Sequence, residues 1–225
     1  MLKSENGDTI LADNYSESLG FGRLENTTSS LSKVETLTME IFNKVFEVWG
    51  CLNLIRDVNT VSIKKRQDET SFQHKCRMIQ IRYEFFLHEY YVLEQRLLTL
   101  VNYIHNSYKK DKSIKSIEIV KLTVELKDYI LNSMAPVRKL RKTHVHLYTL
   151  QSDELAQLQS LAYHISSEKD PEFKRHLTKQ ASAQYKKLQQ GYSSGAKKTM
   201  SGLEKIVDNV LCEIHSYLFN KKGAL

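Results

Sequence analysis

The chain has 225 residues, 41% of them hydrophobic and 26% charged, which is typical of a globular protein large enough to bury a core without metals or disulfides. Its 8 glycines and 2 prolines are too few for the turns of an all-β sandwich or barrel. No apolar run reaches the roughly 18 residues that a membrane span needs. The formal net charge of +7 favours an acidic or polyanionic partner.

Residues 1–30 are predicted to form a flexible or loosely packed N-terminal tail. Their apolar residues follow no helical or strand period, so the segment offers little surface to offset the entropy of ordering it. It also lacks the basic start and apolar stretch of a signal peptide. The three cysteines are widely spaced and odd in number, which favours a reducing compartment, and we expect a cytoplasmic protein.

Residues 31–225 are predicted to form a single helical domain. From Val34 to Val58 apolar residues recur every three or four positions, which indicates one face of a helix, and Ser32 with Glu35 fits a capping box at its start. A second long helix is expected over residues 71–108. The polar connection between them is short, so these two N-terminal helices should pack as antiparallel neighbours.

Further helices are expected along the rest of the chain. A third should cover residues 114–131, with Ile117, Val120, Val124 and Ile130 among its apolar positions. Others are expected at 135–147, 153–165 and 171–190, then a break at Gly191–Gly195 and a last helix at 197–219. The fold class is therefore all-α, an up-and-down bundle of about five to seven helices, with residues 170–225 as an alternative C-terminal extension.

Two windows of the sequence contain basic residues and no acidic ones. The first, between Asp128 and Asp153, holds Arg138, Lys139, Arg141 and Lys142. The second, between Glu172 and Glu204, holds Lys174, Arg175, Lys179, Lys186, Lys187, Lys197 and Lys198. A local excess of cations attracts polyanions such as RNA, although solvated helix faces have the same composition.

The first window also carries two histidines. On a helix of about 100° per residue, His144 falls on the apolar side, whereas His146 falls beside Lys139 and Lys142. Neighbouring cations keep an imidazole neutral near pH 7, and a neutral imidazole can accept the proton of a ribose 2′-hydroxyl. Guanidinium and ammonium groups can hold the phosphate that this hydroxyl attacks, so the chemistry needs no metal and no cofactor.

The run Arg141-Lys142-Thr143-His144-Val145-His146 resembles the R-x4-6-H motif of the HEPN superfamily. The resemblance implies a small all-α, metal-independent endoribonuclease, of a family that includes toxins and antiphage effectors. It implies Arg141 and His146 as the catalytic pair, acting across a homodimer interface, and an antitoxin or other operon-encoded partner. Many members carry Asn, Asp or His after the arginine, where this chain has Lys142.

Further residues are candidates for RNA binding or for supporting the catalytic pair. They are Arg138, Lys139, Lys142 and His144 around the motif, together with Arg82 and Tyr83. The last two belong to an aromatic, cationic stretch for which core packing is the first interpretation and a cleft against the motif helix is the alternative. The alternative is a non-catalytic helical module that binds a protein or a nucleic acid through the second basic window and apolar helix faces. In that interpretation the basic residues before His146 are a solvated helix end.

Overall fold

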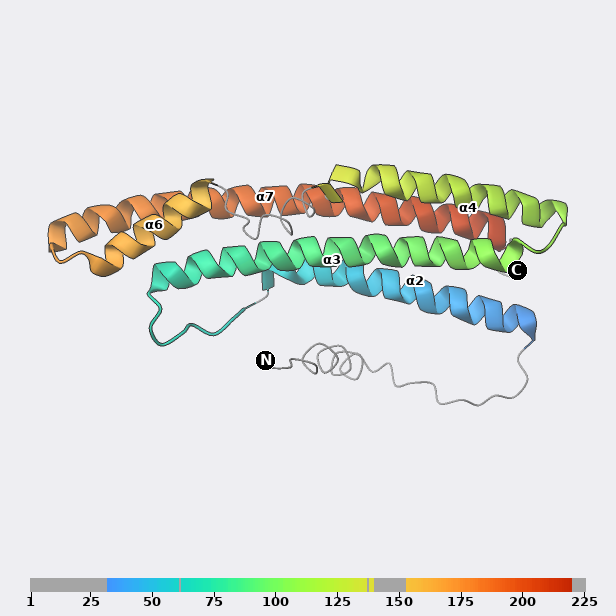
Figure 1. The fold of residues 1–225 in the computed structure, drawn as a ribbon, viewed down its shortest axis with the longest axis horizontal. Coiled ribbons are helices and arrows are strands. Elements are labelled where there is room, and N and C mark those ends of the chain that lie inside the picture. Colours follow the sequence, from blue (N-terminus) through green and yellow to red (C-terminus); the bar gives the residue numbers. More distant parts are fainter. Residues whose placement is uncertain (1–31, 61, 137, 140–152, 220–225) are drawn as a thin grey trace, which may run out of the picture. The chain divides into compact units, whose positions relative to one another are not determined.

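The computed structural model describes residues 32–60, 62–136, 138–139 and 153–219 of the chain. Every regular element in those ranges is helical, which confirms the predicted all-α fold (Figure 1). The elements in chain order are α2 (Lys33–Asp57), the 3-10 turn η1 (Val58–Thr60), α3 (Ser71–Tyr108), α4 (Ile114–Ser133), α6 (Asp153–Ser167) and α7 (Pro171–Leu218). The chain divides into two compact units, Met1–Leu37 and Thr38–Leu225, and the helical packing described below lies within the second.

Side-chain caps fix where several of these helices begin. The capping box at the start of α2 forms as predicted, with Glu35 N–H donating to Ser32 Oγ and Ser32 N–H donating to the Glu35 carboxylate. Thr70 caps α3 through a second capping box with Gln73. Asp170 caps α7 by accepting hydrogen bonds from the backbone N–H groups of Glu172 and Phe173. Pro171 suits the first helical position because its nitrogen carries no hydrogen and needs no acceptor.

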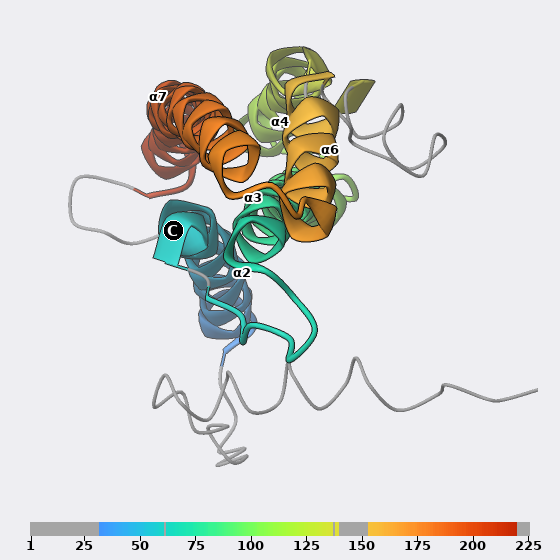
Figure 2. The same ribbon diagram turned by 90° about the vertical axis from the view of Figure 1, so that its left-hand side faces the viewer.

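α2 and α3 pack as antiparallel neighbours, as the short connection between them predicts. Lys44 of α2 lies over the ring of Tyr103, 5.1 Å from its centroid, whereas Glu47, one turn later, pairs with the earlier Arg96. α3 also packs against α4, and α6 packs against α7 and α3, which the end-on view shows (Figure 2).

Two stretches of α7 take part in different cores. The first stretch packs with α6 and the start of α3 in one apolar cluster, which we call the α6 core: Cys76, Ile79, Leu155, Leu158, Ala162, Ile165, Leu177 and Ala181. The second stretch buries Leu203, Val207, Val210, Ile214 and Leu218. The middle of α7 therefore connects a stretch that packs in the α6 core to a second buried stretch near the end of the helix.

The predicted break at Gly191–Gly195 is wrong, since α7 is one continuous helix of 48 residues. Helical glycine costs about 1 kcal/mol relative to alanine, which is a weak preference that tertiary contacts override. Tyr192, between the two glycines, packs against the α6 core and meets the ring of Tyr83 at 5.4 Å. Burial on both sides of this segment therefore keeps it helical.

The apolar positions named for the third helix are not all buried. Ile117 and Val124 are 60% and 49% exposed, and α4 buries Ile119, Leu122 and Leu126 instead. Ile130 is buried as predicted. α4 carries apolar residues on two sides, so periodicity alone does not select the buried one; the inward side also holds Thr123, whose Oγ1 lies 2.9 Å from His105 Nδ1 on α3.

Candidate functional site

The predicted catalytic pair lies outside the described residues. Arg141 and His146 fall within residues 140–152, as do Lys142 and His144, so their placement is not described. Lys139, the last described residue before them, is exposed and helical. The other predicted site residues, Arg138, Arg82 and Tyr83, have described side chains at two separate places.

Arg138 is held by a buried carboxylate on α3. Its Nη2 lies 2.8 Å from Glu94 Oε1 and donates to the Leu131 carbonyl at 2.6 Å. Burial and the nearby Glu94 charge raise the pKa of Tyr90 to about 12, so this phenol stays protonated beside the pair. The Arg138 guanidinium thus fixes the chain to α3 three residues before Arg141.

Arg82 and Tyr83 line a cleft of about 770 Å³, which none of the described residues near the motif lines. The cleft lies between α3, the start of α6 and the middle of α7, and η1 also contributes to its wall. Its apolar and aromatic lining is Val58, Met78, Ile79, Tyr83, Phe86, Leu87, Tyr185, Leu188, Tyr192 and Ala196. The charged side chains that line it are Arg82, Glu154 and Lys187. The volume falls within the range of ligand-binding pockets.

Two tyrosines from different helices meet in this cleft. The Tyr83 and Tyr192 rings are T-shaped, with centroids 5.4 Å apart, and both side chains are half-buried. Burial raises the pKa of both phenols, and for Tyr192 the neighbouring Tyr83 and Glu154 raise it further. Both therefore remain neutral hydroxyls that can donate or accept a hydrogen bond.

The cleft owes part of its space to two glycines of α7. Gly191 and Gly195 lie along its wall, and a Cβ atom placed on either would meet nothing within 4 Å. In the sequence, these glycines predict a helix break, and no local pattern indicates Tyr192 as a site residue. The sequence signal for this part of the cleft is the spacing of the two glycines, which lie one helical turn apart with an aromatic residue between them.

The outer face of α7 carries a row of exposed cations, which we call the basic face. At about 100° per residue, Arg175, Lys179, Lys186 and Lys197 fall within about 40° of one another around the helix. They extend over about 33 Å at 1.5 Å per residue. Among the described residues, no carboxylate pairs with these four side chains.

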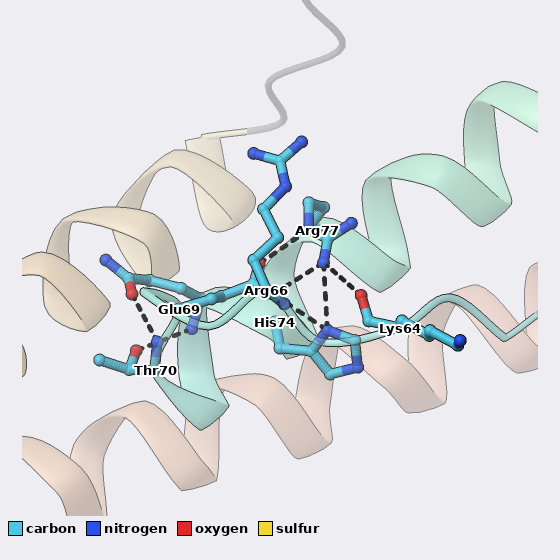
Figure 3. A network of polar contacts seen from close by, with 7 residues as sticks. Lys64, Arg66, Glu69, Thr70, His74 and Arg77 are labelled. Carbon is cyan, nitrogen blue, oxygen red and sulfur yellow. Dashed lines mark hydrogen bonds and ion pairs between the residues drawn. The ribbon is translucent and has the colours of Figure 1, made fainter.

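A polar network fixes the connection between η1 and α3 (Figure 3). Arg77 donates to both Glu69 oxygens at 2.7 Å and to the Lys64 carbonyl at 2.9 Å, and His74 Nδ1 lies 3.2 Å from Glu69 Oε2. The hydrogen bonds from Arg77 are the main reason that the pKa of Glu69 falls to about 2. The network borders a second hollow of about 480 Å³ and holds the connection against α3.

No group of three or more metal-ligating side chains occurs in the described part of the chain, and none of the helices described there is long and apolar enough to cross a membrane. No protein-family model matches this chain, and no curated protein or solved structure matches it either.

Proposed function

We propose that this protein is a metal-independent endoribonuclease of the HEPN type that binds RNA along the basic face of α7. The observation that carries the proposal is the basic face itself, four exposed cations in one row within an acid-free stretch of helix. Backbone phosphates supply most of the non-specific affinity for nucleic acids, and such a row is opposite to them in charge.

The cleavage step rests on the resemblance of the Arg141–His146 segment to the R-x4-6-H motif. His146 accepts the proton of a ribose 2′-hydroxyl, and that oxygen attacks the adjacent phosphorus as the bond to the 5′-oxygen breaks. Arg141 stabilises the charge that develops on the phosphate. A second protonated imidazole, from the other subunit of a homodimer, protonates the departing 5′-oxygen.

The fixed position of Arg138 supports this use of the segment. Catalytic groups must be held precisely, and supporting contacts from rigid elements achieve this. The ion pair with Glu94 ties the chain to α3 three residues before Arg141. We also propose a cytoplasmic location and an operon-encoded antitoxin partner; the three cysteines, which are free thiols, agree with a reducing compartment.

Cleavage of structured and unstructured RNAs by the purified protein tests the catalytic proposal. We expect cleavage in the presence of EDTA, products with 2′,3′-cyclic phosphate ends, and loss of activity in Arg141→Ala and His146→Ala. His164→Ala, which removes an exposed histidine of α6, is the matched control and should stay active. A wild-type dimer that binds these RNAs and leaves all of them intact would contradict the catalytic proposal.

Charge reversal tests the binding surface separately. Lys179→Glu and Lys186→Glu should weaken RNA binding and reduce the salt dependence of the affinity, by about 0.7 in log–log slope for each lost contact to a single strand. Lys121→Glu and Lys127→Glu make the same charge change on exposed positions of α4 and should matter less. Equal losses in both pairs would show that net charge alone, and not this face, attracts RNA.

A second candidate function is that of a non-catalytic module that docks on a protein, and an exposed face of α2 favours it. Met39, Phe42, Phe46 and Trp49 are 43%, 47%, 59% and 39% exposed and recur every three or four residues. Contiguous apolar residues of this kind mark protein contacts. Met39→Glu and Trp49→Glu should then convert an assembled species to a smaller one in light scattering, with RNA binding unchanged.

A further inference from the structure

The cleft between α3, α6 and α7 has the chemistry of a site for a planar, aromatic, partly polar group. Its lining is mostly aromatic and aliphatic, with the half-buried rings of Tyr83 and Tyr192 at 5.4 Å from each other. Bases of single-stranded RNA stack on aromatic side chains, and every base has a face suited to this. A paired base in a duplex is not available for such a contact, so the site selects unpaired nucleotides.

Charged groups at the cleft match the rest of a nucleotide. Lys187, an exposed residue of α7, lines it and lies about 100° around the helix from Lys186 of the basic face. Arg82 adds a second cation to the lining. Glu154 supplies a carboxylate, which accepts hydrogen bonds from the exocyclic amino groups of adenine, cytosine and guanine.

We propose that this cleft holds one unstacked base of a single-stranded RNA. The inference rests on the proposed RNA-binding function and adds the class of substrate that it selects. Space for the base comes partly from Gly191 and Gly195, which line the cleft and where an added Cβ would meet no atom within 4 Å. Larger residues there would occupy the volume that the base needs.

The glycines allow a test that leaves the helix intact. Gly195→Leu fills part of the cleft, whereas Gly202→Leu makes the same change two turns further along α7, at an exposed glycine that does not line the cleft. Each variant is compared with wild type for binding to oligoadenylate and to an oligomer of the same length in which every position is abasic. Both oligomers carry 2′-O-methyl groups, which block attack by the 2′-oxygen, and circular dichroism verifies helicity.

We expect wild type and Gly202→Leu to bind the intact oligomer at least about five-fold more tightly than the abasic one. Gly195→Leu should bind the two oligomers equally, with an unchanged dependence on salt. If wild type binds both oligomers equally but with a steep salt dependence, the cleft proposal is overturned and RNA binding stands. If wild type binds neither oligomer at low salt, the proposed function fails and the cleft proposal fails with it.

Discussion

Arg138 and Glu94 form an ion pair of 2.8 Å in which the carboxylate is almost fully buried and the guanidinium is partly exposed. The Glu94 side chain is 2% exposed, and a carboxylate so far from water needs a charged partner to remain ionised at low cost. Arg138 was predicted from sequence to bind RNA or support the catalytic pair. Its described contacts give it a structural role, and they place that role next to the motif.

Removal of Arg138 should destabilise the protein because it leaves the Glu94 charge buried. We expect Arg138→Met to lower the free energy of unfolding by about 3 kcal/mol, measured by denaturant titration. The double variant with Glu94→Met should lose less than the sum of the two single changes, because the unpaired charge is gone. Lys127→Met, at an exposed position of α4, is the control and should change stability by less than about 0.5 kcal/mol.

Alanine at the two glycines in the centre of α7 should stabilise the fold. The helix is continuous there, and an added Cβ at Gly191 or Gly195 meets no atom within 4 Å. Gly191→Ala and Gly195→Ala should each raise the free energy of unfolding by about 0.5–1 kcal/mol in urea titrations, because alanine loses less backbone entropy. A neutral or destabilising result at both positions would show that α7 breaks in solution.

Stability should fall at acidic pH partly through Glu69. The pKa of this carboxyl is lowered to about 2 in the folded protein, chiefly by hydrogen bonds from Arg77, so the unfolded chain binds the proton more readily. The contribution is therefore complete above the ordinary pKa of about 4.5 and disappears as the pH falls towards 2. Glu69→Gln should melt below wild type at neutral pH, and the difference should shrink steadily across this window.

The three cysteines should differ in their reaction with a thiol reagent. Burial raises the pKa of the Cys76 thiol to about 11, and burial with the Glu89 charge raises that of Cys51. Cys212 is exposed on α7. At pH 8 in native buffer we expect one fast equivalent of labelling, which Cys212→Ser abolishes, and two slow ones that become fast in denaturant. Fast labelling of Cys76 in the native protein would contradict its place in the α6 core.

Local sequence signals were sufficient where short-range chemistry decides the structure. The capping box of Ser32 with Glu35, the start of α7 at Asp170 and Pro171, and the bounds of α3 all depend on residues within a few positions of each other. The repeat of apolar residues likewise predicted most of the buried face of α2, which holds Ile41, Val48, Leu52 and Ile55, although Val34 at its start is exposed. The sequence by itself therefore determined that the chain is an all-α bundle and where most helices begin.

Only the tertiary structure decided the outcomes that depend on contacts between distant residues. α7 continues through Gly191 and Gly195 because Tyr192 packs against Tyr83, more than a hundred positions earlier. The same packing leaves the cleft beside these glycines, and Glu94 fixes Arg138 from a different helix. Helix preferences amount to about 1 kcal/mol per residue, whereas burial of a large side chain contributes about 1.5–3 kcal/mol, so packing overrides the local signal.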